Sequence, residues 1–274
     1  MKKIKLIATD LDGTFLTDDK RISPKNKEAV HEAVEKGIHF VPATGRAYYT
    51  MPPNVMRMGE FDYIITSNGA AVIDVKSGKT VYKKQLERSI ASKIIDYAIK
   101  RDIMVEIFVD GKAYTMRKYM ESLVERGVRE RFVKWYTDTR NVVESYDEIL
   151  VDNITVENIN IIFNNKELRV EMQKEFAAFD DIEVTNSIDN NIEIGAKGCS
   201  KASALKALAD MLGIEMDEIM ALGDNYNDLD MIKEVGIGVA VSNGEEIIRT
   251  EADYITTSNN EDGFYEAVHK FILN

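Results

Sequence analysis

The chain has 274 residues, of which 45% are hydrophobic and 30% are charged, and this balance excludes a disordered or a membrane-embedded protein. The formal net charge of -12 argues against a general binder of nucleic acid or anionic membranes, because phosphate backbones need a basic face. Cys199 is the only cysteine, so an internal disulfide is impossible and we expect a protein of the reducing cytosol.

The first third of the chain alternates strand and helix patterns. The run "KIKLIAT" predicts a short buried strand. "SPKNKEAVHEAVEKG" predicts a helix with Ser23 as N-cap, Pro24 at its first position and Gly37 just beyond its end. "IHFVPAT" and "YIITSNG" predict two more apolar strands. Apolar strands that alternate with amphipathic helices indicate a parallel sheet covered on both faces.

The same alternation returns near the end of the chain. "DEIMALGD", "GIGVAV" and "DYITT" predict strands, and "YNDLDMIKEV", "GEEIIRTEA" and "GFYEAVHKFIL" predict the helices that follow them. The two outer parts of the sequence therefore predict one α/β core.

The middle of the chain has a different texture. "AAVIDVKSGKTVYKK" and "MVEIFVDGKAYTM" predict hairpins that turn at Ser77-Gly78 and Asp110-Gly111, and long helical patterns lie among further strands. We therefore predict a doubly wound, mostly parallel α/β core formed by residues 1–83 and 195–274. Residues 84–194 are expected to form an inserted α+β cap domain.

In a doubly wound sheet, ligands bind beyond the carboxyl ends of the strands. Small and polar residues directly follow four of the predicted strands: Asp10 and Asp12, Thr44-Gly45-Arg46, Asn68-Gly69, and Gly223-Asp224-Asn225-Tyr226-Asn227-Asp228. Lys201 opens a predicted helix just after the expected return from the inserted domain. These side chains are our candidates for the functional site.

Four of the candidates are carboxylates, namely Asp10, Asp12, Asp224 and Asp228. They could not all stay ionised in one crevice, because each like-charge pair at ~4 Å costs about 4 kcal/mol at an effective dielectric of about 20. A divalent cation removes this conflict, and oxygen ligands without histidine or cysteine indicate Mg²⁺. Lys201 and the hydroxyl of Thr44 would then hold the remaining oxygens of a substrate phosphate.

The pair Asp10 and Asp12 suits phosphoryl chemistry. Residues two apart share one side of an extended chain, so both carboxylates can face one ligand. One carboxylate can attack phosphorus, while the other protonates the leaving oxygen and then activates water. We expect Gly13 to let the loop approach the ligand closely.

The ordered motifs resemble those of the haloacid dehalogenase superfamily: Asp10-Leu11-Asp12-Gly13-Thr14, Thr44-Gly45-Arg46, Lys201, and Gly223-Asp224-x-x-Asn227-Asp228. The Asn68-Gly69-Ala70 turn and the insertion between the second and third motifs look like the Cof-type branch, which dephosphorylates sugar phosphates and related metabolites. The resemblance spans nearly the whole chain.

The resemblance also implies roles for individual residues. Asp10 would be the nucleophile and a magnesium ligand, Asp12 the general acid/base whose backbone carbonyl also binds the metal, and Asp224 a magnesium ligand. Phosphate contacts are implied for Leu11 N–H, Thr44, Gly45, Lys201 and Asn227, and a supporting place in the metal shell for Asn225 or Asp228.

These observations predict a magnesium-dependent phosphatase that acts on small phosphate monoesters through an aspartyl phosphate. A phosphoryl transferase or mutase that passes the phosphoryl group to a second hydroxyl needs the same motifs. A non-catalytic binding protein would not need Asp12. Sugar phosphates, flavin mononucleotide and pyridoxal phosphate are all plausible substrates of the family. Arg46 and Asn68 fit structural and substrate-binding roles equally well, whereas Trp135-Tyr136 are expected to pack in the core of the insertion.

Overall fold

The computed structural model describes residues 3–273, and these divide into two compact units. Unit 1 comprises the described residues up to Gly45, then 51–83, and those from Ser200 onward; unit 2 comprises 46–50 and 84–199. The predicted end of the insertion at residue 194 falls inside strand β13 (Asn191–Ala196), which belongs wholly to unit 2.

A parallel sheet in the order β16-β15-β14-β1-β2 forms the centre of unit 1. Its strands are β1 (Leu6–Thr9), β2 (His39–Pro42), β14 (Ile219–Gly223), β15 (Ile237–Val241) and β16 (Tyr254–Thr256). Thr9 lies opposite Pro42 on one side and Leu222 on the other. Strands β2, β1 and β14 therefore end together at one edge of the sheet.

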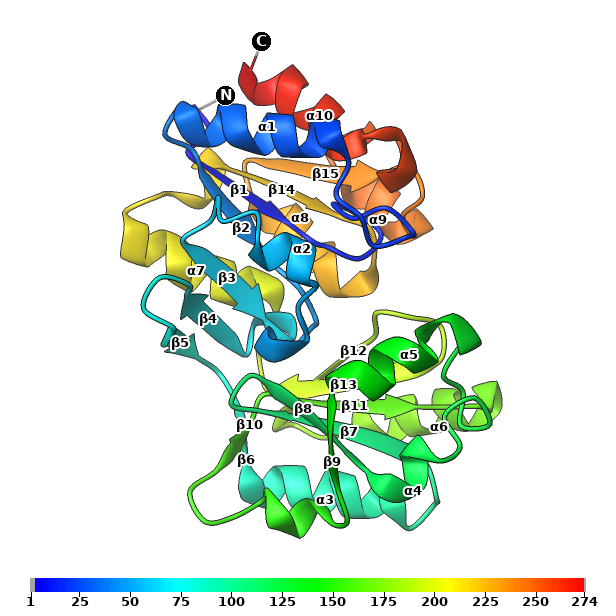
Figure 1. The fold of residues 1–274 in the computed structure, drawn as a ribbon. Helices are drawn as coiled ribbons and strands as arrows, with labels where there is room; N and C mark the ends of the chain where they lie inside the picture. Colours follow the sequence, from blue (N-terminus) through cyan, green and yellow to red (C-terminus); the bar gives the residue numbers. More distant parts are fainter. Residues whose placement is uncertain (1–2, 274) are drawn as a thin grey trace. The chain divides into compact units, whose positions relative to one another are not determined.

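Helices cover both faces of this sheet. They are α1 (Pro24–Glu35), α7 (Lys201–Leu212), α8 (Leu229–Glu234), α9 (Glu246–Glu251), α10 (Gly263–Val268) and a π-helical turn (His269–Leu273). Helices α1 and α10 lie on one side, and α7 and α8 on the other (Figure 1). The fold is thus the doubly wound α/β arrangement that the sequence predicts.

The side chains of the strands explain these two layers. Leu6 and Ala8 share a buried apolar cluster with Leu205 of α7. Phe15, which follows β1, packs edge-on against Phe264 of α10 with 4.9 Å between ring centroids. Because both faces of the strands are covered by apolar side chains, their sequences read as continuous apolar runs rather than as alternating ones.

The predicted ends of α1 are confirmed. The Ser23 side chain accepts a hydrogen bond from the Asn26 N–H, and Pro24 is the first helical residue. Gly37 follows the helix with φ = +77°, a conformation that costs glycine little.

The prediction that "YIITSNG" joins the parallel sheet is wrong in its strand partner. Strand β3 (Tyr63–Thr66) pairs antiparallel with β4 (Ala71–Asp74), and β4 pairs with β5 (Lys79–Lys83). The physical reason is the turn Ser67–Gly69, in which every residue has a positive φ. It reverses the chain at once, so the strand that follows β3 runs back beside it as an antiparallel partner. A single parallel bridge, Ala43 to Ile65, joins β3 to the chain after β2.

Unit 2 contains a second sheet in the order β12-β13-β11-β7-β8-β9. Besides β13, its strands are β7 (Met104–Val109), β8 (Lys112–Met116), β9 (Arg140–Val143), β11 (Asn158–Ile162) and β12 (Ile182–Thr185). All neighbours are antiparallel except β8 and β9. The predicted hairpin turn at Asp110-Gly111 is confirmed, and both residues have a positive φ.

The helices of unit 2 are α3 (Arg88–Ile99), α4 (Arg117–Met120), α5 (Glu130–Thr139) and α6 (Lys166–Phe176). Ile94 of α3 and Met172 of α6 share one buried cluster with Ile107 and Ile161 of the sheet. A small antiparallel pair, β6 (Leu86–Glu87) and β10 (Thr155–Val156), completes the α+β insertion that the sequence predicts.

The remaining short elements are α2 (Pro53–Met56) and the 3₁₀ turns Tyr48–Thr50, Tyr146–Glu148, Met216–Glu218, Tyr226–Asp228 and Asn259–Glu261. Over residues 3–273, no helix combines the length and the apolar character needed to cross a bilayer.

Candidate active site

The strand register of unit 1 brings the first candidate residues together. Asp10 follows β1, and its N–H donates to the Leu222 carbonyl of β14 at 2.9 Å. The N–H of Ala43, beside Thr44, donates to the Thr9 carbonyl at 2.8 Å. Because β1, β2 and β14 run parallel and end at the same edge, the residues that follow them meet there.

Lys201 lies fully buried at the centre of this group. Its Nζ is 2.6 Å from Asp10 Oδ1 and 2.7 Å from Asp228 Oδ1. A buried ammonium without partners would be unfavourable, and two carboxylates satisfy it here. Attraction to Asp10 and Asp228 outweighs burial, which by itself lowers the pKa, so the pKa of Lys201 is raised and the side chain stays charged.

Two local features fix the position of Lys201 at the start of α7. Ser200 caps α7 by accepting the Ser203 N–H at 3.1 Å, which fixes where the helix begins. Gly69 packs against the same point, since a Cβ at Gly69 would lie 2.0 Å from the Ser200 carbonyl oxygen. The close approach of the Ser67–Gly69 turn to the start of α7 therefore requires glycine.

Asp228 anchors the loop that follows β14. Its Oδ2 accepts the N–H groups of Asp224 at 3.0 Å and of Asn225 at 3.1 Å, while its Oδ1 faces Lys201. A Cβ on Gly223 would lie only 2.4 Å from the Asp228 Cβ, so this compact loop also needs its glycine. Both oxygens of Asp228 are thus engaged within the protein.

Asp224 faces the loop that follows β1. Its Oδ1 accepts the Thr14 hydroxyl at 2.8 Å, and a Cβ on Gly13 would lie 2.6 Å from its Oδ2. Gly13 has φ = +94°, and its carbonyl accepts the side-chain amide of Asn243 at 2.8 Å. The close neighbour of Gly13 in the structure is therefore the Asp224 carboxylate, and the approach of this loop to a ligand stays a prediction.

The electrostatics of the site favour the binding of a cation. Burial raises the pKa of Asp10 to about 7, with repulsion from Asp228 and Asp12 adding to the shift and Lys201 opposing it. Burial, then Asp10 and Asp228, hold the pKa of Asp224 well above its usual range. Asp10, Asp224 and Asp228 each offer an oxygen within 4.8 Å of the others. This donor set, all carboxylate oxygens, fits Mg²⁺.

The candidate phosphate-binding residues surround the same edge. Leu11 and Thr44 are buried, and Gly45 and Asn227 are partly exposed. Asn227 Nδ2 donates to Asn68 Oδ1 at 3.0 Å, and a Cβ on Gly45 would lie 3.0 Å from the same oxygen. Asn68 thus links the loops after β2, β3 and β14. This contact gives Asn68 a structural role.

Asn225, the other candidate for the metal shell, is engaged in a turn. Its Oδ1 accepts the Tyr226 N–H at 2.8 Å and caps the 3₁₀ turn Tyr226–Asp228. Arg46 groups with unit 2, where its guanidinium lies 4.6 Å from the ring centre of Trp135. Trp135 itself packs partly buried against the core of unit 2, and Tyr136 is part of that core.

Sequence reasoning missed three contacts made by residues of the motif Asp10–Thr14. They are the Thr14 hydroxyl on Asp224, the Asn243 amide on the Gly13 carbonyl, and Lys20, whose Nζ lies 2.7 Å from Asp12 Oδ1. Thr14 belonged to a recognised motif and could have been found. Lys20 stands in an ordinary polar loop, and nothing in the pattern around it distinguishes it from a solvated lysine.

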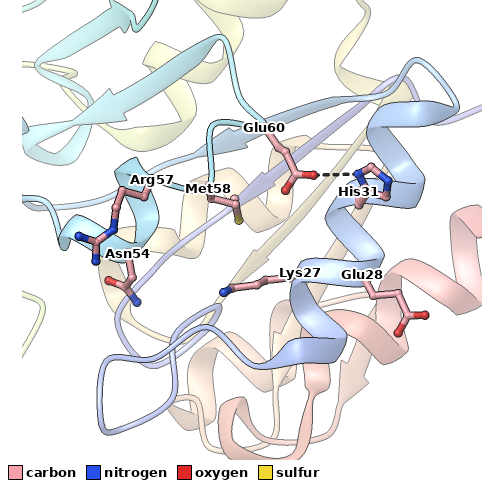
Figure 2. Close-up of a pocket in the computed structure, with 7 residues that line it drawn as sticks. All are labelled: Lys27, Glu28, His31, Asn54, Arg57, Met58 and Glu60. Carbon is pink, nitrogen blue, oxygen red and sulfur yellow. Dashed lines mark hydrogen bonds and ion pairs between the residues drawn. The ribbon is translucent and has the colours of Figure 1, made fainter.

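A separate groove of about 550 Å³ on unit 1 contains none of the candidate site residues. Figure 2 shows its lining: Lys27, Glu28, His31, Asn54, Arg57, Met58 and Glu60. His31 Nδ1 lies 3.0 Å from Glu60 Oε1.

Comparison with known proteins gives the family. The family model described as haloacid dehalogenase-like hydrolase matches residues 7–268. The 5-amino-6-(5-phospho-D-ribitylamino)uracil phosphatase YcsE of Bacillus subtilis (strain 168) is 34% identical over 270 residues, covering 98% of this chain and 96% of that protein. The phosphatase YbjI of Escherichia coli (strain K12), named for the same substrate, is 29% identical, covering 98% and 96%.

Solved structures agree over the whole length. A haloacid dehalogenase-like hydrolase from B. subtilis superposes with a TM-score of 0.86 at 28% identity, covering 98% of this chain and all of that one. A haloacid dehalogenase-like hydrolase from Bacteroides thetaiotaomicron gives 0.82 at 28% identity, covering 98% and 99%. The chain therefore belongs to the haloacid dehalogenase-like hydrolases, in their Cof-type branch, and is a phosphatase.

Proposed function

We propose that the protein hydrolyses small phosphate monoesters with the help of Mg²⁺, through an aspartyl phosphate on Asp10. The observation that carries the proposal is the buried arrangement of Asp10 between Lys201 and Asp224. Lys201 holds one Asp10 oxygen and favours the ionised carboxylate that attack on phosphorus requires. Burial alone would favour the inert, protonated form.

Asp10 and Asp224 are the residues that we assign to the metal, together with the backbone carbonyl of Asp12. Bound there, Mg²⁺ would neutralise the carboxylates and polarise a phosphate oxygen. Asp228 lies in the same group of carboxylates, but it holds Lys201 and two backbone N–H groups. We therefore assign Asp228 and Asn225 to support of the metal-binding loop.

The proposed reaction has two steps. In the first, an Asp10 oxygen bonds to phosphorus, the bond to the leaving oxygen breaks, and Asp12 gives its proton to that oxygen. In the second, Asp12 takes a proton from water, which attacks phosphorus and releases phosphate from Asp10. Thr44, Lys201, Asn227 and the N–H groups of Leu11 and Gly45 are proposed to hold the phosphate oxygens in both steps.

For the substrate, we propose a phosphorylated ribitylaminouracil as the first compound to test. YcsE and YbjI come from different bacteria, cover nearly the whole chain and carry the same substrate in their names.

We further propose that unit 2 is the cap domain that selects the leaving group, since the residues assigned to the phosphate chemistry all belong to unit 1. We also propose the cytosol as the compartment of this protein, because a chain with Cys199 as its only cysteine cannot form an internal disulfide and suits a reducing environment.

The test is release of inorganic phosphate with Mg²⁺ present, from 5-amino-6-(5-phospho-D-ribitylamino)uracil, sugar phosphates, flavin mononucleotide and pyridoxal phosphate. We expect kcat/KM for the first compound to exceed the others by about ten-fold or more. Asp10→Asn is expected to lower it about a thousand-fold or more, whereas Asp62→Asn, at an exposed aspartate of the same unit, leaves it unchanged.

The outcomes separate the two parts of the proposal. Preference for another compound in the panel overturns the proposed substrate alone. Absence of phosphate release from every compound, or full activity of Asp10→Asn, contradicts the proposed reaction.

A further inference from the structure

The carboxylate of Asp12 has a cation of its own. Lys20 Nζ lies 2.7 Å from Asp12 Oδ1, and the two side chains are 34% and 30% exposed. Asp12 is not part of the group in which Asp10, Asp224 and Asp228 offer oxygens within 4.8 Å of one another. Asp12, the proposed general acid, therefore has its own ion-pair partner. This partner is distinct from Lys201 and from the proposed metal, which contact the other carboxylates.

The backbone around Lys20 is held in an uncommon conformation. Lys20 has φ = +59°, and its N–H donates to the Thr17 carbonyl at 2.8 Å. The side-chain amide of Asn54 donates to the Lys20 carbonyl at 3.0 Å. Asn54 comes from α2, on the groove of Figure 2. A left-handed lysine persists only when its surroundings fix it, so this loop holds the lysine at a set point beside Asp12.

Backbone hydrogen bonds also join this loop to the catalytic motif Asp10–Thr14. The Leu16 N–H donates to the Leu11 carbonyl at 2.8 Å, and a bridge pairs Asp12 with Leu16. The Thr17 N–H then donates to the Arg21 carbonyl at 2.9 Å. This short series of hydrogen bonds connects the backbone of Asp12 to the backbone of Lys20, so both ends of the ion pair belong to one hydrogen-bonded loop.

An ordinary surface ion pair gives the comparison. Lys5 Nζ lies 2.7 Å from Glu218 Oε1, also in unit 1, but just before β1 rather than after it. The two pairs match in chemistry and distance, and they differ in that only one contains a proposed catalytic residue. Lys5 is therefore a matched control for loss of a lysine ion pair.

We propose that Lys20 is a positioning residue: it holds Asp12 Oδ1 and thereby orients the carboxyl group so that Oδ2, which carries the proton in the first step, protonates the leaving oxygen. The inference rests on the proposed function, because it assigns Lys20 to the first of the two steps. As the bond between phosphorus and the leaving oxygen breaks, the electron pair stays on that oxygen and the proton of Asp12 neutralises it. Protonation by Asp12 accelerates the first step most when the leaving oxygen is strongly basic.

The test compares phenyl phosphate with p-nitrophenyl phosphate, which have similar size but leaving groups of different basicity. Phenolate is the more basic and needs the proton from Asp12, whereas p-nitrophenolate leaves readily without it. kcat/KM is the quantity to compare, because it reports the steps up to the first cleavage of the phosphate ester. Activity is measured with Mg²⁺ for the wild type, Lys20→Met, Lys20→Arg and Lys5→Met.

We expect Lys20→Met to lower kcat/KM for phenyl phosphate by about ten-fold or more and for p-nitrophenyl phosphate by less than about three-fold. Lys20→Arg restores most of the loss, and Lys5→Met matches the wild type on both substrates. Equal losses on the two substrates, or the same pattern in Lys5→Met, overturn the role of Lys20 and leave the phosphatase reaction standing. A wild-type protein inactive on both compounds and on the metabolite panel contradicts the proposed function and this inference with it.

Discussion

Removal of the Asp10 charge should change how stability without metal depends on pH. The pKa of Asp10 is raised by burial from 3.8 to about 7 in the folded protein, so the folded state binds the proton more tightly than the unfolded state does. The stability that this group contributes is fully present below pH 3.8 and is lost as the pH rises through about 7.

The size of the effect follows from the two pKa values. Between pH 5 and pH 8, a group whose pKa shifts from 3.8 to about 7 loses about 2–3 kcal/mol of its contribution to the free energy of unfolding. Asp10→Asn carries no titrating carboxylate at this position, so the variant should avoid this loss. Asp224 remains in both proteins, and loss of the Asp10 charge removes one of the causes that raise its pKa, so its change adds to the difference between the two profiles.

Urea unfolding in EDTA at pH 5 and pH 8 measures the effect. We expect the wild type to lose about 2–3 kcal/mol more than Asp10→Asn between these two pH values. Added Mg²⁺ should restore wild-type stability at pH 8 and stabilise the variant much less, because the metal site has lost a charged ligand. Parallel pH profiles of the two proteins in EDTA would refute the reasoning.

Three further predictions concern other parts of the structure. EDTA should abolish hydrolysis of p-nitrophenyl phosphate and Mg²⁺ should restore it; turnover that persists after dialysis against EDTA would argue against a metal requirement. Gly69→Ala should lower the free energy of unfolding by about 3 kcal/mol or more, measured in urea, because its φ is +96° and its Cβ would meet the Ser200 carbonyl. Glu106→Gln should cost about 3–5 kcal/mol in the same assay, because Glu106 and Arg140 form a buried ion pair at 2.6 Å inside unit 2. A loss below about 1 kcal/mol in either variant would show that the surrounding residues adapt.

The parts of the fold that follow from local rules were predictable. The N-cap at Ser23 and the positive φ of Gly37 could be predicted because both depend only on residues that are close in the sequence. The doubly wound core follows from apolar strands that alternate with helices. The partner of β3 did not follow, because it depends on the turn Ser67–Gly69, whose left-handed residues include Ser67 and Asn68 rather than glycine alone.

The candidate site divides in the same way. Asp10, Lys201, Asp224 and Asp228 belong to motifs at strand and helix ends, and the structure brings all four together. Gly13 was predicted to be needed, but its neighbour was not, because the contact joins positions more than two hundred residues apart. The ion pair between Lys20 and Asp12 could not be predicted from the sequence, because it depends on the path of one irregular loop.

The aspartyl phosphate on Asp10 is the central claim, and trapping it is the most direct measurement. The protein is mixed with Mg²⁺ and substrate, quenched during turnover and treated with borohydride, which reduces an aspartyl phosphate to homoserine. Peptide mass spectrometry then locates the change. We expect homoserine at position 10, dependent on both substrate and Mg²⁺ and absent from Asp10→Asn. Steady phosphate release with unmodified Asp10, or reduction at another aspartate, would contradict it.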